Sequence, residues 1–255
     1  MTCIIGGICS DGIALIADKK VVDRDTEMVE FKEKLFIFQQ ESFYYPIVVG
    51  SSGTIALYEK FKRAAIEEIK KINPVQPPFD YRNFDSGNFD VSGRLYFYNE
   101  NSEDKRVVLY PYLKKLEDLI RGFKKDYANL GFDVLFAAQV QNRAILFYIH
   151  RDGLSEDVHD FKVIGSGESF ANVFLKSLYQ KNKNIVMRQL AQAGFFIIKY
   201  IEESGLNDGV GVGKDRPQIY FVPNEGPLSQ ADNDFLEECE RRSITAKENF
   251  ENIFQ

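Results

Sequence analysis

Three residues near the start of the chain have the side chains and the spacing to form a nucleophile with its own proton acceptor. Thr2 follows Met1 directly, Asp18 lies sixteen residues after Thr2, and Lys34 lies sixteen residues after Asp18. Removal of Met1 would give Thr2 a free α-amine, whose ordinary pKa of about 7.7–8.0 is near neutrality. Such an amine can act as the general base for the hydroxyl of the same residue, so no histidine is needed.

A threonine site of this kind needs a cation and a carboxylate. A buried cation beside the hydroxyl lowers the barrier to proton transfer and depresses the pKa of the amine, and a carboxylate holds the cation in place. Asp18 ends the apolar segment Ile13–Ala17, and Lys34 begins the β-like segment Lys34–Gln39. We therefore expect Thr2, Lys34 and Asp18 to cluster beside the first strand.

The composition disfavours mechanisms that depend on histidine, a bound metal or paired cysteines. The chain has 255 residues, of which 44% are hydrophobic and 27% charged, enough for a sizeable core without disulfides. The two histidines, His150 and His159, lie in or beside β-like segments and have no metal-ligand spacing. Cys3, Cys9 and Cys239 form no CxxC motif and are odd in number, which favours a reducing, cytoplasmic setting.

The net charge of the chain and the length of its apolar segments disfavour nucleic-acid and membrane partners. The net charge is −6 and no long Lys/Arg run offsets it, so we expect no nucleic-acid partner. The apolar stretches are far shorter than the roughly 20 residues of a membrane span, so we expect no membrane partner. The start MTCIIGGICSDG has no basic region before its apolar run, unlike a signal peptide. We also expect no cofactor and no metal, because the threonine chemistry requires neither.

The patterning predicts a layered protein. The first segments form a hairpin, in which Ile13–Ala17 is apolar at both alternating sets of positions and so is covered on both faces. Strands and helices come in blocks rather than in alternation, which indicates an α+β fold and not a Rossmann-type series. The further predicted strands are 34–39, 44–49, 133–140, 144–150, 161–164 and 218–222, and the predicted helices are 54–72, 113–127, 169–179, 185–201 and a charged tail at 228–252.

Residues 73–110 differ from the rest in composition. Their density of Pro, Asn, Asp and Gly indicates a loop, with a hairpin formed by Arg94–Tyr98 and Arg106–Tyr110. A loop of this length is uncommon inside a compact domain, so we interpret it as an insertion.

Several of these features together resemble a known family, the β-type subunits of the proteasome, which are threonine-type N-terminal nucleophile hydrolases. The resemblance covers residues 2–72 well and 113–223 more loosely, and Gly165-Ser166-Gly167 before a helix is similar to the second half of that family. The residues that carry it are Thr2, the Asp11-Gly12 turn, the run Leu15-Ile16-Ala17-Asp18-Lys19-Lys20, Lys34 and the glycine-bounded helix start Gly50–Gly53.

The resemblance implies a single domain over residues 1–255, a four-layer αββα sandwich, with the insertion at 73–110 and the helical tail at 228–255. It implies that Thr2 is nucleophile and base, Lys34 the polarising cation, Asp18 the carboxylate that holds it, and Gly53 the donor of an oxyanion-hole N–H. The implied function is a threonine peptidase that forms an acyl-enzyme on Thr2. Its implied substrate is a peptide or unfolded protein, and the implied assembly is a homo-oligomeric ring, with an unfoldase or proteasome-like subunits as candidate partners.

Some positions depart from the family pattern. Gly131 stands where the family has a serine, Asp208-x-x-Gly211 lacks the serine of a second motif, and Val22 replaces a substrate-contacting threonine. Three alternatives therefore stay open: a peptide ligase or narrow-specificity amidase on the same fold, a non-catalytic structural subunit, and an ordinary strand threonine after a retained Met1.

Overall fold

The described residues form two antiparallel five-stranded sheets and a two-stranded sheet. The computed structural model describes residues 2–22, 29–38, 47–53, 55–71, 106–126, 132–140, 142–203 and 216–251. The first sheet has the order β10-β1-β2-β11-β12 and the second the order β5-β6-β7-β8-β9. The strands are β1 (Ile4–Cys9), β2 (Gly12–Ala17), β3 (Lys20–Val22), β4 (Val29–Phe31), β5 (Leu35–Phe38), β6 (Ile47–Ser52), β7 (Asp133–Val140), β8 (Arg143–Ile149), β9 (Ser155–Asp157), β10 (Phe161–Ile164), β11 (Gln218–Pro223) and β12 (Ser229–Gln230).

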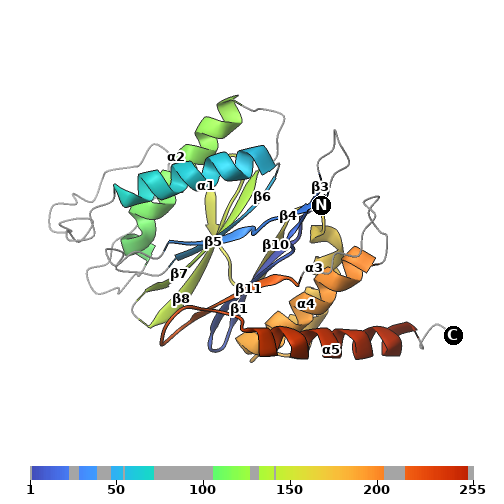
Figure 1. Cartoon of the computed structure of the whole chain (residues 1–255). Helices are drawn as coiled ribbons and strands as arrows, with labels where there is room; N and C mark the ends of the chain where they lie inside the picture. Colours follow the sequence, from blue (N-terminus) through green and yellow to red (C-terminus); the bar gives the residue numbers. More distant parts are fainter. Residues whose placement is uncertain are drawn as a thin grey trace.

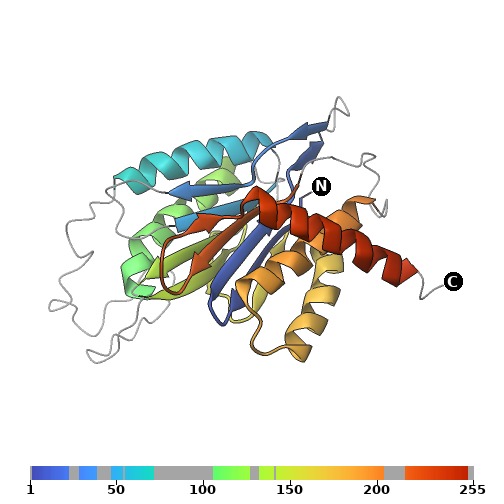
Figure 2. The ribbon, with the colours of Figure 1, turned by 60° about the horizontal axis from the view of Figure 1, so that its bottom comes forward.

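Helices cover the outer face of each large sheet (Figure 1). The second sheet lies under α1 (Ile55–Lys70) and α2 (Arg106–Asp126), and the first sheet lies against α3 (Glu168–Lys181) and α4 (Met187–Glu203). The last helix, α5 (Asn233–Glu251), packs along α4 (Figure 2). The molecule is thus the four-layer αββα sandwich expected from the sequence.

Strand β2 shows how the sequence produces these layers. Ile13, Leu15 and Ala17 face the core between the two sheets, whereas Ala14 and Ile16 face the helices, and all five are fully buried. The apolar character of both faces, which predicted cover on both sides, is confirmed.

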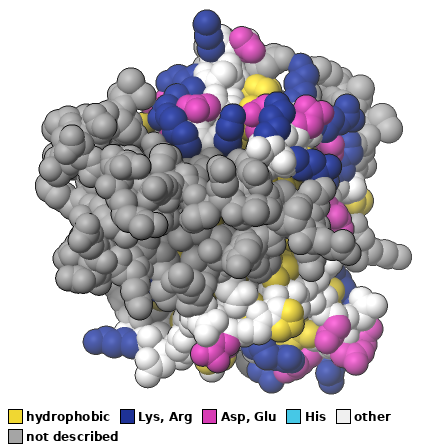
Figure 3. Space-filling model, turned by 90° about the vertical axis from the view of Figure 1, so that its left-hand side faces the viewer, with side chains coloured by type: hydrophobic (Ala, Val, Ile, Leu, Met, Phe, Trp, Pro, Cys, Tyr) yellow, Lys and Arg dark blue, Asp and Glu magenta, His cyan; other side chains and the backbone are white. Residues whose placement is uncertain are grey.

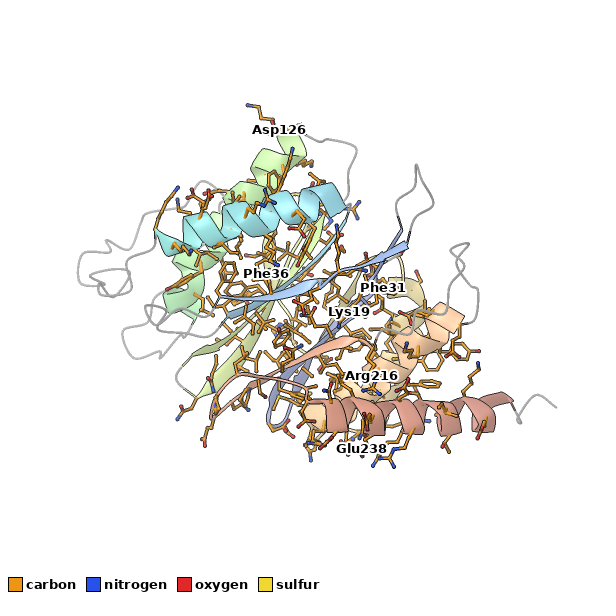
Figure 4. All side chains as sticks on the ribbon, in the orientation of Figure 1. Lys19, Phe31, Phe36, Asp126, Arg216 and Glu238 are labelled. Atoms are coloured by element: carbon orange, nitrogen blue, oxygen red, sulfur yellow. The ribbon has the colours of Figure 1, made fainter. Side chains whose placement is uncertain are left out.

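A second core fills the space between the second sheet and its helices. Phe36 on β5 lies below α1 (Figure 4) and packs edge-on against Phe61, with 6.3 Å between ring centroids. Phe61 also contacts Phe132, at 4.9 Å between centroids. These aromatic contacts fix the helical layer above the strand that Lys34 precedes.

Two local expectations differ from the structure. Arg106–Tyr110, expected as the second arm of a hairpin, is the first part of α2. The correction follows from periodicity, because Leu109, Tyr112 and Leu116 are buried on one face of a helix that continues to Asp126. The short strands β3, β4, β9 and β12 were not expected, and β12 corrects the start of the predicted helical tail, whose helix begins only at Asn233. Residues 72–105 lie outside the described ranges.

The outer surface carries charges of both signs. On the face in Figure 3, Lys and Arg side chains lie interspersed with Asp and Glu among the described residues. No described helix is both long and apolar enough to cross a membrane.

The aromatic core makes a testable contribution to stability. Phe61→Ala should lower the free energy of unfolding by about 3–5 kcal/mol, because it leaves a cavity where a fully buried ring packs. Phe31→Ala is the matched control, because the Phe31 side chain is 44% exposed and its loss should change stability by only about 0.5 kcal/mol. Denaturant titration measures both, and equal effects would contradict this assignment of the core.

Candidate active site

The site is organised by a buried ion pair between two strand ends. Lys34 Nζ lies 2.6 Å from Asp18 Oδ2, and the two residues are 5% and 4% exposed. Asp18 directly follows β2 in the first sheet, and Lys34 directly precedes β5 in the second. The predicted contact between Asp18 and Lys34 is therefore present, and it joins the two sheets.

The carboxylate of Asp18 is also tied to the first strand. Its Oδ1 accepts a hydrogen bond from the backbone N–H of Cys3 at 2.6 Å. The backbone N–H of Asp18 in turn donates to the carbonyl of Cys3 at 3.1 Å. These two bonds hold Asp18 against the residue that follows Thr2, so its charged partner Lys34 is fixed close to the start of the chain.

The segment Gly165-Ser166-Gly167 holds Thr2 from the other side. The backbone nitrogen of Thr2 donates to Ser166 Oγ at 3.2 Å, and the N–H of Gly167 donates to the Thr2 carbonyl at 3.2 Å. Gly165 has φ +98°, and a Cβ there would lie 2.2 Å from the Thr2 carbonyl oxygen. Only glycine allows this approach, because a side chain would collide with the Thr2 backbone.

The pKa of the Cys3 thiol is shifted by burial and by the charges of Asp18 and Lys34. Burial raises its pKa well above the ordinary range, the Asp18 carboxylate raises it further, and the Lys34 ammonium opposes them. Cys3 is 2% exposed. It therefore stays a protonated, inaccessible thiol and is a poor nucleophile, unlike the half-buried Thr2 beside it.

Gly53 lies between the end of β6 and the start of α1, whereas Gly50 and the two serines after it, expected to open the helix, belong to β6. Gly53 is exposed and has φ +142°, a backbone conformation that favours glycine. Its backbone N–H is thus at a strand-to-helix turn, the kind of position from which oxyanion holes take donors.

The small sheet of β3 and β4 continues directly from the Asp18 strand. The N–H of Lys32 donates to the carbonyl of Lys19 at 2.8 Å, which closes this sheet next to Lys34. Figure 4 labels Lys19, directly before β3, and Phe31, the last residue of β4, near each other. Val22, the position of the expected substrate contact, belongs to β3.

The structure brings Asp18 and Lys34 into contact beside Cys3, the residue that follows Thr2, and it adds one residue whose role the sequence analysis missed. A serine was sought at Gly131, which lies outside the described residues, as does Asp208. The serine at the Thr2 nitrogen is Ser166, 164 residues away along the chain. Its only signal in the sequence was the Gly-Ser-Gly pattern before a helix.

Comparisons with solved structures show what this fold resembles. Anbu (ancestral beta-subunit) from Yersinia bercovieri superimposes with a TM-score of 0.68 at 15% identity, covering 100% of this chain and 96% of that one. The Anbu (Gly-1) mutant from Hyphomicrobium sp. strain MC1 gives 0.68 at 12% identity with the same coverage. Anbu from the same strain gives 0.67 at 13%, covering 99% and 96%. No protein-family model and no curated protein matches the sequence.

These comparisons correct the family expected from the sequence. The assignment to proteasome β-type subunits is wrong, because the similar structures named above are Anbu proteins, whose fold is proteasome-like. Their similarity extends over the whole chain, including the tail that the expected family left unmatched. At 12–15% identity it shows the fold alone.

The buried pair should dominate the stability of this region. Lys34→Met should lower the free energy of unfolding by about 3–5 kcal/mol, because it leaves the Asp18 carboxylate buried without its cation. Lys247→Met should cost less than about 1 kcal/mol, since Lys247 pairs with Glu203 at 2.7 Å but both side chains are over 30% exposed.

The double variant D18N/K34M tests whether the loss comes from the unpaired charge. Because it removes both charges, it should recover part of the stability lost in the single variants. Additive losses in a double-mutant cycle, measured by denaturant titration, would contradict a direct interaction.

Proposed function

We propose that this chain is an N-terminal threonine hydrolase that cleaves amide bonds of peptides through an acyl-enzyme on Thr2. The proposal requires removal of Met1, after which the Thr2 nitrogen that now donates to Ser166 becomes a free amine. The observation that carries it is the buried Lys34–Asp18 pair, held by Asp18 against the backbone of Cys3. A structural role alone does not require two buried charges next to an N-terminal threonine.

The first step is acylation. The Thr2 amine accepts the hydroxyl proton as the Oγ1 attacks the substrate carbonyl, and a C–O bond forms. The N–H of Gly53 is our candidate donor to the oxyanion of the tetrahedral intermediate. The C–N bond then breaks, the proton passes to the leaving amine, and an ester on Thr2 remains.

The second step is deacylation. Water attacks the ester carbonyl while the Thr2 amine takes a proton from it. The ester C–O bond then breaks, the amine returns that proton to the Thr2 oxygen, and the acid product leaves. Lys34 favours both steps, because its positive charge disfavours protonation of the neighbouring amine and stabilises negative charge at the hydroxyl oxygen. Ser166 keeps the amine in place through its hydroxyl.

The setting of the reaction is part of the proposal. All three cysteines are free and buried, which suits a reducing cytoplasmic compartment. We propose that the substrate is a peptide or an unfolded protein and that the chain acts in a homo-oligomeric ring, to which an unfoldase or further proteasome-like subunits can deliver substrate.

Variants at the site test the proposed chemistry. Thr2→Ala should lower kcat on a peptide library by more than about 10⁴-fold, because the covalent nucleophile is lost. Thr2→Ser should keep measurable activity, and Cys3→Ser is the matched control that should keep it nearly unchanged. Product analysis by mass spectrometry distinguishes hydrolysed from ligated peptides, and full activity in Thr2→Ala would contradict the proposal.

The pH dependence gives a second test. Activity requires the unprotonated amine, so the rate should fall as the pH drops through the pKa of that group. The midpoint should lie below the roughly 7.7–8.0 of an ordinary α-amine, because the Lys34 charge disfavours the ammonium form. In Lys34→Met the midpoint should move upward, and an unchanged midpoint would show that Lys34 does not act on the amine.

A further inference from the structure

Gln218 is a buried polar residue at the start of β11 whose side chain lies between the two large sheets. It is 1% exposed, and its backbone pairs with Ala17 of β2, the residue directly before Asp18. Tyr220, two positions along the same strand, faces the core between the sheets. The backbone of Gln218 therefore lies beside the strand that ends next to Asp18, and its side chain points toward the opposite sheet.

The amide of Gln218 makes a two-point contact with the strand that follows Lys34. The N–H of Leu35 donates to Gln218 Oε1 at 2.9 Å, and Gln218 Nε2 donates to the carbonyl of Leu35 at 3.0 Å. Because β5 is at the edge of its sheet, this amide serves Leu35 as a neighbouring strand would. On the other side of this segment, toward β6, the N–H of Ser51 donates to the Lys34 carbonyl at 3.4 Å.

We propose that Gln218 is a positioning residue for the Lys34–Asp18 pair, an inference that rests on the proposed function. One side chain connects the backbone beside Asp18 to the backbone beside Lys34 and so sets the separation of the two strand ends. A primary amide suits this task because it presents a donor and an acceptor in one plane, which matches the N–H and C=O of a single residue. Gln218 does not contact the substrate.

A role in stability alone is the competing explanation, and the chain offers a matched control for it. Gln139, on β7 of the second sheet, also reaches the segment after β11, where its Nε2 donates to the carbonyls of Asn224 and Gly226 at 3.1 and 3.0 Å. This bridge spans the same two sheets, at the opposite end of β11 from Gln218. Loss of either amide should affect stability, but only loss of Gln218 should affect the site.

The experiment compares Q218M with Q139M in the full-length protein, because methionine has a similar length and carries no hydrogen-bonding amide. The first readout is the rate at which a threonine-directed electrophile labels Thr2 as a function of pH. Q218M should label about 10²-fold more slowly, with the pH midpoint moved upward, because Lys34 is displaced from the amine. Q139M should match the unmodified protein in rate and midpoint even if its Tm falls.

The second readout does not depend on activity. The ¹⁵N chemical shift of the Lys34 side chain should change in Q218M and stay unchanged in Q139M. Q218E, which keeps an acceptor for the Leu35 N–H, provides the same comparison if Q218M does not fold. An unchanged Lys34 signal and an unchanged pH midpoint in the Gln218 variant would overturn the proposal.

The two readouts also separate this inference from the proposed function. If the unmodified protein is not labelled at Thr2, the proposed function fails. A shift of the Lys34 signal in Q218M alone would then still show that Gln218 positions the buried pair, whereas an unchanged signal would overturn that too.

Discussion

The ion pair between Lys34 and Asp18 is the interaction on which the arrangement of the site depends. Both charges are almost completely buried, so each has lost most of its hydration, and their mutual attraction at 2.6 Å must offset that loss. The carboxylate has a second donor, the N–H of Cys3, which satisfies its other oxygen. Because the two partners come from different sheets, the pair forms only when the sandwich is closed.

The start of the chain is positioned by backbone contacts rather than by its own side chain. Asp18 holds Cys3 on one side, and the Gly165-Ser166-Gly167 segment holds the nitrogen and the carbonyl of Thr2 on the other. The close approach of Gly165 leaves no room for a side chain. These contacts restrain the Thr2 backbone, which is the preorganisation that a nucleophile with its own amine base requires.

Much of this arrangement could be predicted from the sequence, for physical reasons that particular residues make clear. The apolar residues on both faces of β2 predicted layers above and below this strand. The opposite charges of Asp18 and Lys34, at the ends of two apolar strands, predicted that the two side chains pair with each other. The contact between Ser166 and Thr2 could not be predicted, because it joins residues 164 apart and depends on the packing of two strands. The contact of Gln218 with Leu35 could not be predicted either, because the two residues lie in different sheets and nothing in the sequence distinguishes Gln218 from an ordinary strand residue.

The segment Arg106–Tyr110 was misjudged because a short apolar run fits a strand or a buried helix equally well. The Thr, Asp and Lys spacing indicated the fold but did not distinguish proteasome β-type subunits from Anbu proteins.

The identity of the first residue of the mature chain, measured with a covalent probe, decides between a catalytic and a merely structural Thr2. The protein is treated with a threonine-directed electrophile, digested, and its N-terminal peptide is sequenced by mass spectrometry. We expect a peptide that begins at Thr2 and carries the probe on that residue. A peptide that begins at Met1, with Thr2 unmodified, would contradict the proposed mechanism, because the base that the reaction requires would then be absent.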